Sequence, residues 1–123
     1  LIVVLGHTKC GAVKGACDHI EMGNLTELLS KLQPAVYQEK TTKADRTSSN
    51  STFVENVSKI NVKRSVKSII ERSFILETMV ENGSIGIVGA MHNIDTGKVT
   101  FYNDVMFIRD EKNPKFSVAD LRY

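Results

Sequence analysis

The residues best suited to chemistry in this chain are His7 and Cys10, which lie three positions apart in the run Gly-His-Thr-Lys-Cys-Gly at 6–11. Imidazole nitrogen and thiolate sulfur are both ligands of Zn²⁺, at about 2.0 Å and about 2.3 Å. On a tight turn both side chains can point into one site without helical spacing. The pair predicts a zinc site, and the alternative on spacing alone is a solvated histidine beside a buried thiol.

Two other kinds of site do not fit this run. The flanking glycines have the spacing of a phosphate-binding P-loop, but Ala12-Val13 stands where that loop needs Lys followed by Ser or Thr. A thioredoxin-like redox site needs two cysteines separated by two residues, whereas six residues separate Cys10 from Cys17. We therefore predict that Cys17 is a core thiol and that His19 lies on an exposed helix face.

The elements around the run must place it where a strand ends and a helix begins. Residues 1–5 are continuously apolar, which predicts a strand buried on both faces of a parallel sheet. Small residues at 11–17 predict a helix packed closely on that sheet. Open α/β sheets bind ligands at the carboxyl ends of strands, and helix N-termini offer free N–H groups to thiolates and anions. The backbone at Gly11 is therefore a candidate anion-binding site, and we expect a side chain there to crowd the turn. Gly15 is expected to matter for packing.

Local signals predict the remaining elements. Apolar residues at helical spacing predict helices over 24–38, 52–73 and 74–81, the first two opened by capping boxes at Asn24 and Thr52. The other predicted features are a surface loop at 40–51, a buried strand at 84–90, a turn at 94–97, an antiparallel strand at 99–105 and a loosely docked tail from Asn113. We predict an α/β fold with a mainly parallel sheet flanked by helices and an antiparallel C-terminal strand, in one domain over residues 1–123.

Composition and charge narrow the class of protein. The chain has 123 residues, of which 41% are hydrophobic and 24% charged, as is typical of one globular domain. The formal net charge is +2 with both signs interspersed, so no basic block predicts binding to nucleic acid or to an anionic membrane. The longest apolar run, residues 1–5, is far shorter than the roughly 18 residues of a membrane span.

The cysteines and the first residue add two expectations. The two cysteines are too far apart on one helix to pair, and free thiols favour a reducing compartment such as the cytoplasm. Four Asn-x-Ser/Thr triplets point weakly the other way, but a chain rich in these residues produces them by chance. The sequence begins at Leu1, without Met and inside a strand-like run, so we expect an upstream segment to be missing.

Three stretches together resemble the β-class carbonic anhydrases. Residues 1–12, Leu-Ile-Val-Val-Leu-Gly-His-Thr-Lys-Cys-Gly-Ala, resemble the second zinc motif of that family. Residues 87–99, with Gly-Ala-Met-His-Asn-Ile-Asp-Thr-Gly-Lys-Val, resemble its closing hairpin, and residues 57–76 resemble the helical segment before that hairpin. The motifs occur in the family's order and spacing, and they cover the chain to about Phe107.

The resemblance implies a reaction and a site. It implies zinc-dependent, reversible hydration of CO₂ to bicarbonate and a proton, with Zn²⁺ held by His7, Cys10 and a further thiolate. One histidine and two thiolates form a neutral centre, whose water is less acidic than on three histidines, so activity should favour alkaline pH. It also implies that the backbone at Gly11 helps to bind the substrate anion, and that the protein forms a homodimer or a higher homo-oligomer.

The chain also departs from the family pattern. No Cys-x-Asp-x-Arg motif, which supplies the second thiolate and an Asp-Arg pair, occurs in the sequence, so no catalytic residue is assigned. His92-Asn93 replaces the usual Tyr-Asp; His92 is a conceivable ligand, but we favour a hairpin-end side chain.

The alternatives to catalysis are a non-catalytic carbonic-anhydrase-like domain and an anion-binding α/β module. The family sheet places the missing motif strand beside residues 1–5. We therefore expect this chain alone to be inactive, to bind zinc weakly and to self-associate along that open edge.

Overall fold

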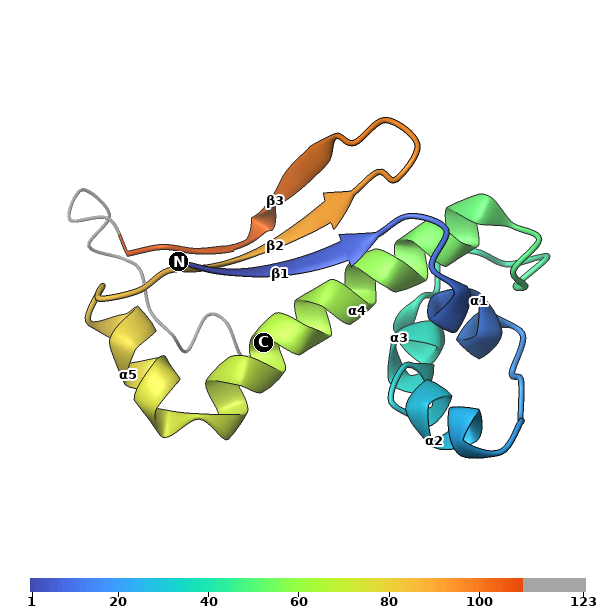
Figure 1. Cartoon of the computed structure of the whole chain (residues 1–123), viewed down its shortest axis with the longest axis horizontal. Helices are drawn as coiled ribbons and strands as arrows, with labels where there is room; N and C mark the ends of the chain where they lie inside the picture. Colours follow the sequence, from blue (N-terminus) through green and yellow to red (C-terminus); the bar gives the residue numbers. More distant parts are fainter. Residues whose placement is uncertain (110–123) are drawn as a thin grey trace. The chain divides into compact units, whose positions relative to one another are not determined.

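The structure is a computed structural model that describes residues 1–109. It contains one strand, five helices and two further strands along the described chain (Figure 1). These are β1 (Ile2–His7), α1 (Gly11–Cys17), α2 (Asn24–Ser30), α3 (Gln33–Gln38), α4 (Ser51–Arg72), α5 (Phe74–Glu81), β2 (Ile87–His92) and β3 (Val99–Phe107). The tail predicted from Asn113 lies outside the described residues.

The three strands form one sheet in the order β1-β2-β3. The Ile2 amide donates to the Gly86 carbonyl at 2.8 Å and the Thr8 amide to the His92 carbonyl at 2.9 Å, so both ends of β1 keep the same register against β2. These two strands run parallel, and β3 returns antiparallel after the turn that follows His92. The predicted α/β fold with an antiparallel final strand is confirmed.

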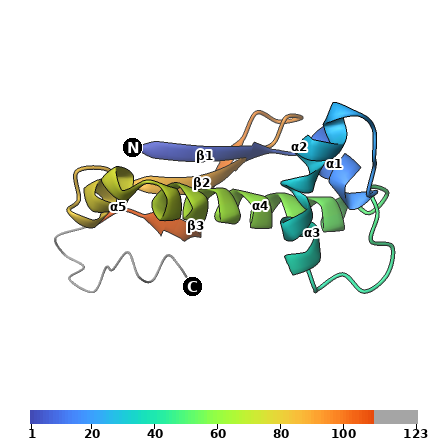
Figure 2. The same ribbon diagram turned by 90° about the horizontal axis from the view of Figure 1, so that it is seen from below.

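The described chain divides into two compact units, which we describe separately. The first unit contains most of the sheet, the second half of α4, and α5. Its core joins Val66 and Ile70 of α4 and Val80 of α5 to Ile87 of β2 and Val105 of β3. The two helices therefore cover one face of the sheet, as Figures 1 and 2 show. The single-domain expectation stays a prediction.

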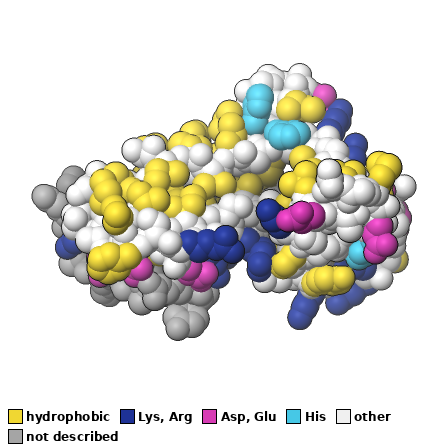
Figure 3. Space-filling model, turned by 60° about the horizontal axis from the view of Figure 1, so that its bottom comes forward, with side chains coloured by type: hydrophobic (Ala, Val, Ile, Leu, Met, Phe, Trp, Pro, Cys, Tyr) yellow, Lys and Arg dark blue, Asp and Glu magenta, His cyan; other side chains and the backbone are white. Residues whose placement is uncertain are grey.

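β1 differs from its sequence prediction. Ile2 and Val4 pack against the core of the first unit, but Leu1, Val3 and Leu5 on the alternate positions are 73%, 42% and 51% exposed. Since β1 is an edge strand of the described sheet and the helices of the first unit cover one face only, the prediction of burial on both faces is wrong for these residues. Hydrophobic side chains also remain at the surface in Figure 3.

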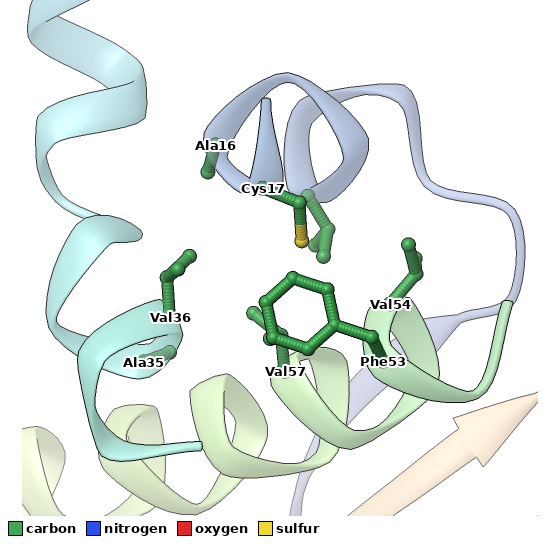
Figure 4. Packing of buried hydrophobic residues seen from close by; sticks show 8 residues of the cluster. Ala16, Cys17, Ala35, Val36, Phe53, Val54 and Val57 are labelled. Carbon is green, nitrogen blue, oxygen red and sulfur yellow. The ribbon is translucent and has the colours of Figure 1, made fainter. Parts of the chain in front are cut away.

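The second unit contains α1, α2, α3, the first half of α4 and the turn at His92–Lys98. Its core is built from small and β-branched side chains around the ring of Phe53, which is fully buried. Figure 4 shows the sulfur of Cys17 directed toward that ring. Cys17 is 1% exposed, so its prediction as a core thiol is confirmed.

Helix boundaries differ from prediction where a backbone feature overrides the apolar spacing. The region 24–38 holds two helices, because Pro34 has no N–H to donate to the preceding turn and instead occupies the first turn of α3. The residue before α2 is Gly23 with φ +50°, and no side chain caps that helix, so the capping box at Asn24 is wrong. At α4 the side chain of Asn50, and not Thr52, caps the helix by accepting from the Phe53 amide at 3.2 Å.

The loop between α3 and α4 has an ordered polar interior. Glu39 is 3% exposed, and its carboxylate accepts hydrogen bonds from both the amide and the hydroxyl of Thr41 and from the Thr42 amide. Arg46 donates to Glu39 at 3.1 Å and to the Val36 carbonyl at 3.0 Å, and its guanidinium lies 4.6 Å from the centre of the Phe53 ring. The predicted surface loop is thus anchored to the core of the second unit.

Within residues 1–109, no helix combines the length and the apolar content that crossing a membrane requires.

Candidate functional site

The turn between β1 and α1 places the predicted zinc pair. His7 is the last residue of β1, and only Thr8, Lys9 and Cys10 separate it from the first residue of α1. Cys10 precedes the helix in an extended conformation, and its carbonyl accepts the first helical hydrogen bond from the Lys14 amide at 3.0 Å. The expected position of the pair, after a strand and before a helix, is confirmed.

The imidazole of His7 is exposed, and one of its two ring nitrogens has a hydrogen-bond partner. Its Nδ1 atom lies 2.9 Å from the carbonyl oxygen of Thr8. In the tautomer that carries the proton on Nδ1, the ring donates to this carbonyl and presents the lone pair of Nε2 outward. A second hydrogen bond of this kind orients most metal-binding histidines. That tautomer would leave Nε2 available to a metal, and the role of His7 as a ligand stays a prediction.

The two cysteines have different environments. Cys10 is free and partly exposed, and its side chain borders the core of the second unit. Cys17 is also free, but burial, followed by the negative charge of Asp18, raises the pKa of its thiol to about 11. A buried thiol that resists ionisation is a poor metal ligand, so only Cys10 of the two can offer a thiolate at the surface.

The donors fit zinc in type but not in number. In the part of the chain that the structure describes, no three side chains of His, Cys, Asp or Glu lie close enough together to hold a metal ion. His92 ends β2, and its backbone carbonyl accepts a hydrogen bond from the Thr8 amide. A zinc centre therefore needs at least one donor beyond His7 and Cys10.

Gly11 differs from expectation in one respect. A Cβ atom added there would meet no atom within 4 Å. The steric crowding that the sequence suggested is therefore wrong for the described residues, and the proposed role of the Gly11 backbone in anion binding stays a prediction. Gly15, expected to matter for packing, is tighter: a Cβ there would lie 3.2 Å from Cδ1 of Leu29.

The two residues between His7 and Cys10 make contacts that no sequence pattern predicted. The Thr8 hydroxyl accepts a hydrogen bond from the Ile94 amide at 3.1 Å. The Lys9 ammonium lies 2.7 Å from a carboxylate oxygen of Asp95. Both partners belong to the turn between β2 and β3. The only sequence signal was the turn-forming run Asp-Thr-Gly at 95–97, which says nothing about its partner.

A cavity of about 190 Å³ lies beside these contacts in the second unit. It is lined by Thr8, Lys9, Lys14, Ser48, Ser51, Val54, Glu55, Asn93 and Asp95.

Comparison with known proteins gives consistent matches. The family model described as "Carbonic anhydrase" matches residues 1–99. "Carbonic anhydrase 2" of Mycobacterium tuberculosis is 28% identical over 116 residues, which is 90% of this chain and 53% of that protein. The same protein from a second strain gives the same values.

Solved structures match the fold. The β-carbonic anhydrase CafA of Aspergillus fumigatus aligns with a TM-score of 0.69 and 24% identity, over 98% of this chain and 55% of the other. A structure of tetrameric β-carbonic anhydrases from Sordaria macrospora aligns with a TM-score of 0.68 and 24% identity, over 83% of this chain and 51% of the other. The chain thus spans about half the length of the proteins that it matches.

Proposed function

Because the chain belongs to the carbonic anhydrase family, we propose that the complete protein is a zinc enzyme that interconverts CO₂ and bicarbonate. The observation that carries the proposal is the placement of His7 and Cys10 on one short turn, with His7 oriented by the Thr8 carbonyl. Since the chain covers about half of its relatives, the activity is proposed for the whole protein and not for these residues alone.

Each residue of the pair has a defined role in this proposal. Nε2 of His7 would bind zinc while Nδ1 donates to Thr8. Cys10 would bind as a thiolate from its partly exposed position before α1. When bound, zinc lowers the pKa of a coordinated water toward neutrality and so supplies hydroxide for attack on CO₂. The peptide N–H of Gly11 is proposed to help bind the bicarbonate anion.

The third protein donor is proposed to come from outside the described residues. The only other cysteine of the chain, Cys17, is buried and holds its proton. A second thiolate beside His7 and Cys10 would give a neutral centre, for which we propose higher activity at alkaline pH. The proton acceptor is not assigned to any residue of this chain.

We propose a homo-oligomeric assembly, supported by the tetrameric relatives from Sordaria macrospora. The free thiols support a reducing compartment such as the cytoplasm. The proposed ligands are CO₂ and bicarbonate, and neither nucleic acid nor a membrane is among the proposed partners.

One observation favours a second candidate, a non-catalytic carbonic-anhydrase-like domain or an anion-binding module. Within residues 1–109 the donor set stops at two, and catalytic zinc centres use three protein ligands. This candidate predicts that the complete protein is isolated with little zinc and still binds bicarbonate.

Zinc analysis with X-ray absorption spectroscopy on the complete protein separates the candidates. We expect about one Zn²⁺ per chain, bound by sulfur and nitrogen, with Cys10→Ser removing one sulfur ligand and His7→Ala one nitrogen ligand. The matched controls are Cys17→Ala and His19→Ala, which change the same residue types away from the turn and should leave the metal shell intact. Full zinc occupancy after both His7→Ala and Cys10→Ser would refute the assignment.

A further inference from the structure

The turn that carries His7 and Cys10 is held from one side by the turn between β2 and β3, His92–Lys98, which we call the hairpin turn. The backbone of Thr8 donates to His92, its hydroxyl accepts from Ile94, and Lys9 pairs with Asp95. Every residue between the two proposed donors thus contacts the hairpin turn. Because all of these residues belong to one compact unit, the contacts form a single local structure.

The backbone at Lys9 needs such support. Its φ is +56°, in the left-handed region that residues with side chains rarely adopt. Conformations of this kind persist only where the surroundings hold them, and they concentrate at functional sites. The left-handed residue reverses the chain between the end of β1 and the start of α1, so its conformation sets how Cys10 is presented relative to His7.

The hairpin turn is itself well ordered by its own hydrogen bonds. The side chain of Asn93 accepts from the amides of Asp95 at 2.9 Å and Thr96 at 3.2 Å. Its backbone amide donates to the Lys98 carbonyl, and its carbonyl accepts from Gly97, both at 2.8 Å. Gly97 has φ +77°, which glycine adopts at no steric cost. The hairpin turn can therefore act as a fixed support.

A cavity borders the turn that carries His7 and Cys10. The space of about 190 Å³ is lined by Thr8 and Lys9 from the turn and by Asn93 and Asp95 from the hairpin turn. Beside this space, hydrogen bonds and the ion pair join Thr8 and Lys9 to the hairpin turn.

The contacts differ in strength. The Lys9 and Asp95 side chains are 58% and 59% exposed, and ion pairs of that kind are screened by solvent and salt. The Thr8 side chain is half-buried, and its hydroxyl accepts from a backbone amide of the hairpin turn, a contact that does not depend on charge. We rank the contact between Thr8 and Ile94 as the main one and the ion pair as secondary.

We propose that the hairpin turn presets the geometry of the two metal donors, with Thr8 as the principal positioning residue and Asp95 as a weaker one. The identity of the metal rests on the proposed function, whereas the geometry rests on the contacts themselves. Thr8 touches neither metal nor substrate in this proposal; it acts through His7 and Cys10.

The test compares Thr8→Val, which keeps the shape and removes the hydroxyl, with Thr8→Ser, which keeps the hydroxyl. The control is Thr26→Val in α2. The Thr26 hydroxyl also accepts a hydrogen bond from a backbone amide, that of Met22 at 2.7 Å, but it lies away from the turn. The complete protein is freed of metal and titrated with Co²⁺, and the absorption band of the bond between cobalt and the thiolate is followed. We expect Thr8→Val to weaken Co²⁺ binding by about tenfold or more.

The other variants should behave differently. Thr8→Ser should restore affinity and band position, and Thr26→Val should leave both unchanged. Asp95→Asn should weaken binding by less than about threefold, with the effect vanishing at high salt. A Thr8→Val protein that binds Co²⁺ with the affinity and spectrum of the unmodified protein would overturn the proposal.

One measurement keeps the proposal testable if Thr8→Val does not fold or if the unmodified protein binds no Co²⁺. In the unmodified protein the Ile94 amide should be protected from hydrogen exchange, and exchange at the unprotected rate would overturn the proposal. Failure of Co²⁺ binding together with a protected Ile94 amide would count against the proposed function alone.

Discussion

Val62 of α4 lies directly over Gly89 of β2, with its Cγ1 atom 2.8 Å from the position that a Cβ atom at residue 89 would occupy. The Cγ2 atom of the same side chain lies 2.9 Å from the corresponding position at Gly6 of β1. The helix thus reaches the sheet at two positions without side chains. A β-branched valine cannot rotate away easily, so the close approach depends on both glycines.

Replacing Gly89 should therefore destabilise the protein. We expect Gly89→Ala to lower the free energy of unfolding by about 1–3 kcal/mol, because the new methyl group overlaps Val62 and also Val105, whose Cγ1 lies 2.9 Å away. Urea unfolding measures the change. The control is Gly11→Ala, where the new methyl group meets open space and should cost little. Equal losses in the two variants would contradict this account of the packing.

Glu39 should make stability depend on pH at the acid end. Burial alone would raise the pKa of this carboxyl, but hydrogen bonds from Thr41 and Thr42 outweigh burial and hold the pKa below its ordinary value. Since the folded pKa lies below the unfolded one, the stabilisation is complete above the ordinary glutamate pKa of about 4.3. It is lost as the pH falls from there through the lower pKa of the folded protein.

Urea unfolding of Glu39→Gln at several pH values checks this dependence. The variant should be less stable than the unmodified protein by about 1–3 kcal/mol at pH 7, and the gap should shrink below about pH 4. Glu21→Gln, which changes an exposed carboxylate, should show no comparable gap. A gap for Glu39→Gln that stays constant down to pH 2 would contradict the role given to the ionised Glu39.

The loop that contains Glu39 also illustrates what sequence reasoning could not reach. The polar residues 40–51 correctly predicted a loop between helices. The burial of Glu39 depends on Arg46, seven residues later, and on Phe53, over which Arg46 lies. The spacing of apolar and polar residues along the sequence does not predict such a combination, because each residue alone is typical of an exposed loop or a helix.

Boundaries were predictable where a single local signal sets them. The helix predicted over 74–81 matches α5, which Ser73 caps by accepting from the Leu76 amide and which Gly83 follows with φ +81°. The place of His7 and Cys10 between a strand and a helix was likewise predictable, while their role as metal ligands stays a prediction. The resemblance to β-class carbonic anhydrases is confirmed. The contact between Thr8 and Ile94 joins residues 86 positions apart, so no local sequence pattern predicts it.

The two cysteines should differ sharply in reactivity. Burial and the nearby charge of Asp18 raise the pKa of Cys17 to about 11, so at pH 8 only roughly one Cys17 in a thousand is a thiolate. Of these two thiols, iodoacetamide should modify only Cys10 in the folded, metal-free protein, and should reach Cys17 only after denaturation. Mass spectrometry locates the label, and Cys17→Ala should react like the unmodified protein. Two thiols that react equally fast in the folded protein would contradict the burial of Cys17.

Stopped-flow measurement of CO₂ hydration by the complete protein tests the central claim, that His7 and Cys10 hold the zinc of a carbonic anhydrase. We predict activity that requires zinc and rises toward alkaline pH. It should fall by about 100-fold or more in His7→Ala and in Cys10→Ser, and stay close to that of the unmodified protein in His19→Ala and Cys17→Ala. Undiminished hydration by the variant that carries both His7→Ala and Cys10→Ser would contradict the account.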